Sequence, residues 1–259
     1  MIFSDCLKGA AADGFAPLRK EREAFMGKNY RFLFWDVDQT LLDFKKSESY
    51  ALREAFRNFG READDETVSL YSGINEGLWK RFERGEISKE ELKLERFRIL
   101  FRELRITEID VAKFQEIYQA ALGGVCYYRD DSYTLCTALG ENYRQYVVSN
   151  GVAVTQHRKM ELSGFGNLMD GVFISEEVGV PKPYRAFYDS CFDGIPAFEP
   201  ELALAIGDSL TSDIRGAHAA GIDACWYNPE GLPFSGEPED APEYEIRNLW
   251  EIKKILGEE

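Results

Sequence analysis

Histidine is scarce in this chain of 259 residues, which has only His157 and His218. Catalytic triads and metal sites built on histidine therefore have little to draw on. The five cysteines are odd in number and show no Cys-x-x-Cys spacing, which argues against a disulfide framework or a zinc site. We expect reduced thiols in a cytoplasmic protein at Cys6, Cys126, Cys136, Cys191 and Cys225.

Long hydrophobic runs are also missing. No segment approaches the ~20 consecutive apolar residues that a membrane-spanning helix needs. The first 25 residues carry Asp5 and Asp13 and lack the basic-then-apolar order of a secretory signal. We therefore expect neither a membrane segment nor a signal peptide.

Positive charge is in the minority, with 31 Lys and Arg against 46 Asp and Glu and a net charge of −15. Such a chain repels nucleic acid and anionic membrane surfaces, so we expect neither as a partner. An anionic substrate would need local positive charge, from a metal ion or a placed lysine. Hydrophobic residues make up 44% of the chain, enough for the core of one domain, with or without an insertion.

Short apolar runs predict the strands of a parallel sheet. Residues 31–35 form such a run, which is typical of a strand buried on both faces. Segments with helical patterns separate the later runs, and this alternation favours right-handed βαβ units. The later strands are expected at 145–148, 171–174, 202–206 and 222–227, before a closing helix at 248–256. We expect Trp35, Trp226 and Trp250 in the core.

The block from 46 to 122 has no strand pattern and is expected to be an inserted helical domain. Ser88-x-x-Glu91 is a capping box, and apolar residues at 97, 100, 101 and 104 then recur on one helix face. Further helices are expected near 48–59, 66–83 and 109–121. The expected division is an appendage at 1–27, a core domain at 28–45 and 123–259, and the helical domain at 46–122.

Polar clusters follow three of the predicted strands. They are Asp36 with Asp38, Ser149 with Asn150, and Asp208 with Asp213. In an open parallel sheet the ligand crevice lies outside the carboxyl ends of the strands, so we expect these clusters to meet there. Taken alone, Asp36-x-Asp38 also fits an ordinary turn or helix cap.

The full set of motifs resembles the haloacid dehalogenase-like (HAD) phosphohydrolases. Its members, in order, are Asp36-x-Asp38-x-Thr40, Ser149 after a strand, Lys182 between two prolines, and Gly207-Asp208-x₄-Asp213. The resemblance covers residues 29–256. It implies a Rossmann-like three-layer α/β core with a parallel sheet. The helical block directly after the first motif resembles the C1 type of cap domain.

The resemblance also implies the role of each motif residue. Asp36 would be the nucleophile that forms an aspartyl-phosphate, and Asp38 the acid and base. Lys182 would balance the negative charge of the phosphate. Its flanking prolines restrict the backbone of Lys182 and so partly fix the direction of its ammonium group. The implied Mg²⁺ would bind Asp36, Asp208 and the backbone carbonyl of Asp38. Ser149 and Asn150 would bind the phosphate. Asp213 and Thr40 would contact the ligating and catalytic residues without binding the substrate themselves. For Ser149 and Asp213, the alternative role is that of a helix cap.

Substrate choice is expected to lie in the cap. Residues 74–79, Arg96-Phe97 and 176–183 resemble the YjjG/YfnB-type 5′-nucleotidases, which remove phosphate from nucleoside monophosphates. Trp79, Tyr71 or Phe82 could stack on a base, or each could belong to the cap core. We predict a Mg²⁺-dependent phosphomonoesterase that acts on nucleoside 5′-monophosphates. The alternatives are a phosphatase of a small sugar phosphate or phosphoglycolate, and a catalytically silent HAD-fold binding protein.

Overall fold

The computed structural model describes residues 28–258, which contain a six-stranded sheet with parallel neighbours throughout. The strand order is β3-β2-β1-β4-β5-β6. The predicted appendage at 1–27 lies outside the described residues, as does Cys6. The strands are β1 (Phe32–Trp35), β2 (Arg144–Ser149), β3 (Gly171–Ile174), β4 (Ala203–Gly207), β5 (Asp223–Tyr227) and β6 (Tyr244–Ile246).

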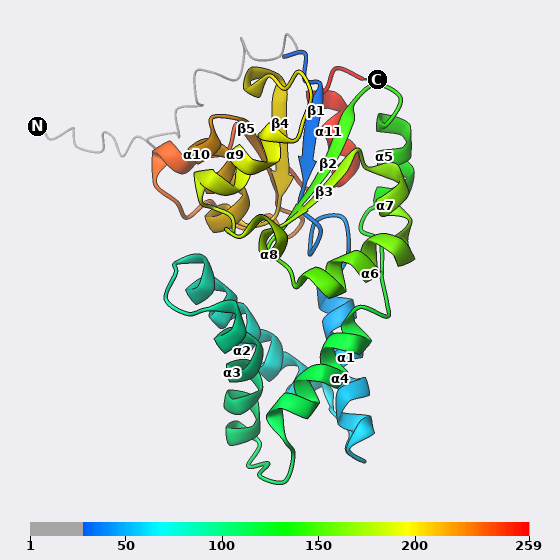
Figure 1. The fold of residues 1–259 in the computed structure, drawn as a ribbon, viewed down its shortest axis with the longest axis vertical. Helices are drawn as coiled ribbons and strands as arrows, with labels where there is room; N and C mark the ends of the chain where they lie inside the picture. Colours follow the sequence, from blue (N-terminus) through cyan, green and yellow to red (C-terminus); the bar gives the residue numbers. More distant parts are fainter. Residues whose placement is uncertain (1–27, 259) are drawn as a thin grey trace, which may run out of the picture.

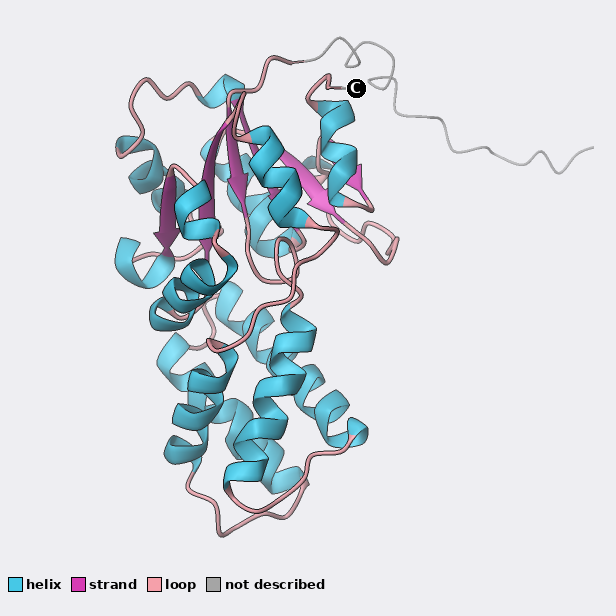
Figure 2. Cartoon of the chain, turned by 90° about the vertical axis from the view of Figure 1, so that its right-hand side faces the viewer, coloured by secondary structure: helices cyan, strands magenta, loops and turns pink. Residues whose placement is uncertain are grey.

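Helices cover both faces of the sheet and make the predicted three layers (Figures 1 and 2). Successive strand residues point to opposite faces. Leu33 and Trp35 therefore pack with α5 (Ser132–Leu139), α6 (Ala153–Ser163), α7 (Phe165–Leu168) and α11 (Ile252–Ile255). Phe32 and Phe34 pack on the opposite face with α8 (Ser175–Val178), α9 (Arg185–Asp193) and α10 (Arg215–Ala220).

Four helices follow β1 and lie beyond the carboxyl ends of the strands, toward which the strand arrows point (Figure 1). They are α1 (Phe44–Asn58), α2 (Asp65–Glu83), α3 (Lys89–Glu103) and α4 (Val111–Leu122). Their apolar faces share a core of their own, centred on Phe97, Phe114 and Tyr118. Because this core is separate from those on the sheet, we propose that the four helices are the inserted cap domain.

Each of the four helices begins with a side-chain cap. The oxygen of the capping residue accepts a hydrogen bond from a backbone N–H in the first turn, which that turn otherwise leaves unpaired. At Ser88 the bond comes from Glu91 N, at 3.1 Å, as the capping box predicts. The other three caps are Asp43, Asp64 and Asp110.

Two sequence expectations need correction, and one strand was not predicted. Helix α1 begins at Phe44, earlier than 48, because Asp43 caps it. Strand β6 was not expected, since only three residues pair within a proline-rich stretch. Trp250 is not in the core, because it is 36% exposed and its indole N–H donates to Asp130 O at 2.7 Å.

The four cysteines among the described residues are free thiols. Within the described part of the chain, every helix is too short or too polar to cross a membrane.

Candidate active site

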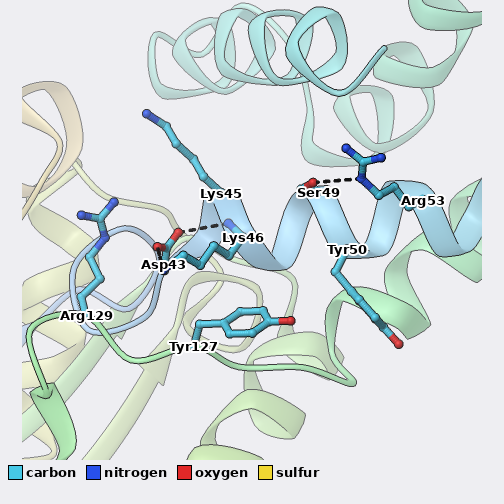
Figure 3. A pocket seen from close by; sticks show the side chains of 8 residues that line it. All are labelled: Asp43, Lys45, Lys46, Ser49, Tyr50, Arg53, Tyr127 and Arg129. Carbon is cyan, nitrogen blue, oxygen red and sulfur yellow. Dashed lines mark hydrogen bonds and ion pairs between the residues drawn. The ribbon is translucent and has the colours of Figure 1, made fainter. Parts of the chain in front are cut away.

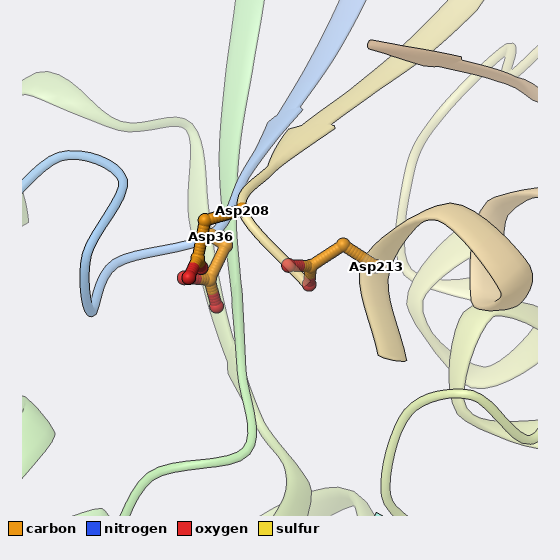
Figure 4. Close-up of side chains that lie close together, drawn as sticks. All are labelled: Asp36, Asp208 and Asp213. Atoms are coloured by element: carbon orange, nitrogen blue, oxygen red, sulfur yellow. The ribbon is translucent and has the colours of Figure 1, made fainter. Parts of the chain in front are cut away.

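Three acidic side chains meet at the carboxyl-end edge of the sheet (Figure 4). Asp36 follows β1 and Asp208 follows β4, and these two strands are neighbours in the sheet. Asp213 comes from the single-turn helix η2 (Leu210–Ile214) just beyond β4. One carboxylate oxygen of each residue lies within 4.8 Å of the others. The topology thus brings together residues more than 170 positions apart in the sequence.

The ammonium group of Lys182 ties this cluster together. Its Nζ donates to Asp36 Oδ1 at 2.8 Å, to Asp213 Oδ1 at 2.6 Å and to Val148 O at 2.8 Å. The side chain is buried, so water does not compete for these bonds. Asn150 holds the backbone of Lys182 with two further bonds, one to the N–H and one to the carbonyl, each of 2.9 Å.

Asp213 has both carboxylate oxygens occupied. Oδ1 accepts from Lys182, and Oδ2 accepts from the backbone N–H of Ser209 at 3.0 Å. Gly207 makes room for it, because a Cβ at that position would lie 2.3 Å from the Asp213 Cγ. Asp213 therefore anchors the lysine and the loop, while Lys182 bonds only one of the two carboxylate oxygens of Asp36.

Burial makes negative charge at this cluster costly. Loss of solvation raises the pKa of Asp36 from 3.8 to about 7, with the Lys182 charge opposing and the Asp213 charge adding to the rise. Burial, followed by the charges of Asp36 and Asp213, raises the pKa of Asp208 well above its usual value. For Lys182, burial opposes the charged form, but the two aspartates outweigh it and raise its pKa. The cluster is short of positive charge.

The side chain of Asp38 is hydrogen-bonded to α6 rather than to Lys182. Its Oδ1 accepts from Lys159 Nζ at 2.5 Å, and its Oδ2 accepts from Gln156 Nε2 at 2.6 Å. The sequence interpretation missed both partners. No local pattern marks them, because the buried face of α6 is mostly polar and the apolar Val154 and Leu162 are exposed.

The other predicted residues lie at varied distances from the cluster. Thr40 is buried, and its hydroxyl lies 3.5 Å from Asp208 Oδ1, at the limit of a hydrogen bond. Ser149 is buried at the end of β2, and its Oγ accepts from Gly151 N at 3.1 Å. Both therefore line the same edge of the sheet as Asp36.

The aromatic residues proposed to stack on a base belong to the cap. Tyr71 is fully buried and stacks on Phe97 at 5.3 Å between ring centroids, so it has no free face for a base. Trp79 is half-buried and packs edge-to-face on Phe82 in a small apolar cluster between α2 and α3. A base-stacking role for Trp79 stays a prediction.

The ends of α2 and α3 reach the core beside the acidic cluster. Glu83, at the end of α2, accepts a hydrogen bond from Thr211 in η2. Lys89, at the start of α3, donates to Ser175 Oγ at 2.9 Å and to Gly151 O at 3.3 Å. These contacts close one side of the site, and the sequence interpretation did not single them out.

An open groove lies elsewhere, where α1 leaves the core (Figure 3). Two of its cations already have partners, since Lys46 pairs with Asp43 and Arg53 pairs with Asp65. None of the predicted site residues lines it. The residues that do are Asp43, Lys45, Lys46, Ser49, Tyr50, Arg53, Tyr127 and Arg129.

Comparison with known proteins identifies the family. The family model described as haloacid dehalogenase-like hydrolase matches residues 33–227. YfnB of Bacillus subtilis, whose name gives no substrate beyond HAD-hydrolase, is 38% identical over 89% of this chain and 97% of its own. A crystal structure of YfnB bound to magnesium superimposes with a TM-score of 0.83, covering 88% of this chain and 99% of that one.

Two further relatives carry a substrate in their names. The pyrimidine 5′-nucleotidase PynA of Streptococcus pneumoniae is 36% identical over 88% of this chain and 95% of its own. The pyrimidine 5′-nucleotidase YjjG of Escherichia coli is 27% identical over 87% of this chain and 97% of its own. The similarity therefore includes the cap helices as well as the sheet.

Proposed function

The chain belongs to the haloacid dehalogenase-like hydrolase family, and on that premise we propose that it is a phosphomonoesterase acting on nucleoside 5′-monophosphates. The observation that carries the proposal is the cluster of Asp36, Asp208 and Asp213 at the carboxyl-end edge of the sheet, in which Lys182 pairs with Asp36 and Asp213. A nucleophilic carboxylate, oxygens for a cation and a fixed positive charge are the groups that phosphoryl transfer needs.

In the first proposed step, a carboxylate oxygen of Asp36 attacks phosphorus and the bond to the ester oxygen breaks. The alcohol leaves with a proton from Asp38, and the phosphoryl group stays on Asp36. In the second step, water attacks phosphorus, Asp38 takes its proton, and the bond to Asp36 breaks to release phosphate. Because Lys182 holds Asp36 Oδ1, we assign the attack to Oδ2.

Lys182 and Ser149 would bind the oxygens of the transferred phosphoryl group. The Lys182 ammonium lies against Asp36, where it balances charge that develops as the phosphorus bonds rearrange. Ser149 ends β2 next to β1, which places its hydroxyl at the same edge of the sheet. Asn150 acts through its two bonds to the Lys182 backbone, which support a positioning role beside the phosphate-binding role expected from the motif.

The donor set fits a magnesium ion. Three carboxylates surround one ammonium group, so the ionised cluster is short by two positive charges. Carboxylate and carbonyl oxygens are the ligands that Mg²⁺ prefers. Asp36, Asp208 and the backbone carbonyl of Asp38 would hold the ion, with Asp213 behind them. When bound, the ion would neutralise the carboxylates and the phosphate oxygens, and so let two anions meet.

The substrate part of the proposal rests on the relatives. PynA and YjjG are both named as pyrimidine 5′-nucleotidases, and their similarity extends over nearly their whole length. We therefore favour a pyrimidine nucleotide over a purine nucleotide, with the cap helices α2 and α3 as the place where the base is selected.

A substrate panel tests both levels of the proposal. The purified protein is assayed with 4-nitrophenyl phosphate with and without Mg²⁺, and then with dUMP, dTMP, UMP, AMP and phosphoglycolate. We expect Mg²⁺-dependent hydrolysis and the highest kcat/KM with the pyrimidine nucleotides. Preference for phosphoglycolate would refute the substrate and leave the chemistry standing. No hydrolysis of any compound would refute the enzyme and favour a binding protein.

A further inference from the structure

Both oxygens of the Asp38 carboxylate are held by a helix on which the family signature has no member. Lys159 and Gln156, both on α6, bond Oδ1 and Oδ2 at 2.5 and 2.6 Å. We propose that Lys159 and Gln156 are positioning residues that orient the Asp38 carboxylate for its proton transfers. This inference rests on the proposed function, since it concerns the acid and base of that reaction.

The local sequence builds this arrangement. Helix α6 begins just after Ser149 and Gly151, so its first turns lie beside the acidic cluster. Gln156 and Lys159 are three residues apart and therefore share one face of the helix. Gly151 leaves the space for the amide, because a Cβ there would lie 2.0 Å from the Gln156 Nε2. Any larger residue at 151 would push Gln156 away from Asp38.

Burial of the two donors contributes little to the stability of the fold, so we explain it by their bonds to Asp38. Lys159 and Gln156 are each 1% exposed. A buried ion pair repays little of the solvation that its charges lose. Gln156 Oε1 is buried without a hydrogen-bond partner among the described residues, an unfavourable state for an amide. The amide is thus turned so that its N–H reaches Asp38 while its own oxygen stays unpaired.

The held carboxylate remains able to exchange a proton. Each carboxylate oxygen has two lone-pair positions, and one donor on each oxygen leaves the second position free. The Asp38 side chain is 25% exposed, whereas the Lys159 side chain is only 1% exposed. The two donors therefore fix the plane of the carboxylate from its buried side and leave its exposed side free for proton transfer.

The same lysine also contacts the first residue of α1. The ammonium of Lys159 lies 5.2 Å from the ring centroid of Phe44, the first residue of α1. Phe44 follows the segment that links β1 to the cap, so the lysine that holds Asp38 also contacts the base of the cap helix.

The leaving group distinguishes a positioning role from a merely structural one. The nucleoside oxygen of dUMP needs a proton to leave, whereas 4-nitrophenolate leaves without one. Since general acid catalysis contributes about 10²–10⁴-fold, misplacing the acid should remove part of that factor only where a proton is needed. For Lys159→Met we expect kcat/KM for dUMP to fall by about 10- to 100-fold and that for 4-nitrophenyl phosphate by less than about 3-fold.

Two further variants keep the test decisive. Gln156→Met retains the ion pair and should show the same selective loss to a smaller extent, even where Lys159→Met folds poorly. Arg158→Met alters a neighbouring exposed residue of the same helix and should change neither substrate. Far-UV circular dichroism and urea unfolding establish that each variant compared is folded.

The outcomes separate this inference from the proposed function. Equal losses on the two substrates in folded variants, or no loss on either, would overturn the positioning role and leave the phosphatase intact. If the wild type hydrolyses 4-nitrophenyl phosphate but not dUMP, only the nucleotide proposal fails, and the alkyl substrate of the test becomes phosphoglycolate. A wild type without activity on any of the three would overturn both.

Discussion

Replacing Asp36 by asparagine should abolish turnover and make the metal-free protein more stable at neutral and alkaline pH. The amide cannot carry a phosphoryl group through the proposed route, so kcat should fall below detection. The fold should be retained, because Lys182 keeps its bonds to Asp213 and Val148.

The stability effect follows from the pKa of Asp36, which burial raises from 3.8 to about 7. The unfolded chain releases this proton near pH 4 and the folded protein only near pH 7. Between these values the folded state binds more protons, so the free energy of unfolding falls as pH rises. About three pH units at 1.36 kcal/mol each is on the order of 4 kcal/mol.

Asparagine does not ionise, so the variant does not lose this part of the free energy of unfolding as pH rises. The variant minus wild-type difference in unfolding free energy should therefore be near zero at pH 4 and approach roughly 4 kcal/mol in favour of the variant at pH 8. Urea unfolding in EDTA at pH 4, 5, 6, 7 and 8 measures it. The exposed Asp193, at the end of α9, offers a matched Asp193→Asn control.

Magnesium should reverse the ranking, because a ligand stabilises only the protein that binds it. Saturating Mg²⁺ should restore stability to the wild type at pH 8 and do little for Asp36→Asn. A difference that does not change with pH, or a variant that is the less stable protein at pH 8 in EDTA, would refute the account of the cluster.

Two further substitutions test the site and the cap. Lys182→Met should lower kcat, measured by steady-state kinetics, by about 10²–10³-fold, because one fixed charge at the transition state contributes ~3–4 kcal/mol. Arg185→Met, which changes an exposed residue three positions further on, is the control. A loss of kcat below tenfold in Lys182→Met would contradict the proposed role of Lys182. Phe114→Ala should lower the unfolding free energy by about 3–5 kcal/mol in urea titrations, since Phe114 is fully buried against four aromatic rings. A change below about 1 kcal/mol would show that the cap core repacks.

Local patterns were enough to place most elements. Capping and apolar periodicity predicted α3 from Ser88 onward, because a cap bonds within one turn and a helix face repeats every few residues. The apolar run before Asp36 predicted β1 for the same reason. Strand β6 escaped prediction because its three residues pair only with β5, a partner that no local pattern identifies.

The candidate site divides in a similar way. The motif residues Asp36, Asp208 and Lys182 could be chosen from the sequence, because two of them follow recognisable strands and the third lies between two prolines. The parallel topology then carries them to one edge of the sheet. The pKa values of these residues could not be predicted from the sequence, since they depend on how far packing excludes water and on which charges lie nearby.

Lys159 and Gln156 show most clearly what tertiary structure alone decided. In the sequence they are ordinary members of a helix, 121 and 118 positions from Asp38. Only the packing of α6 against the loop after β1 brings them within hydrogen-bond distance of Asp38. Local sequence determined which residue types are present and where most elements begin. The three-dimensional arrangement decided which charges meet, because Coulomb and hydrogen-bond energies depend on distance in space and not on separation along the chain.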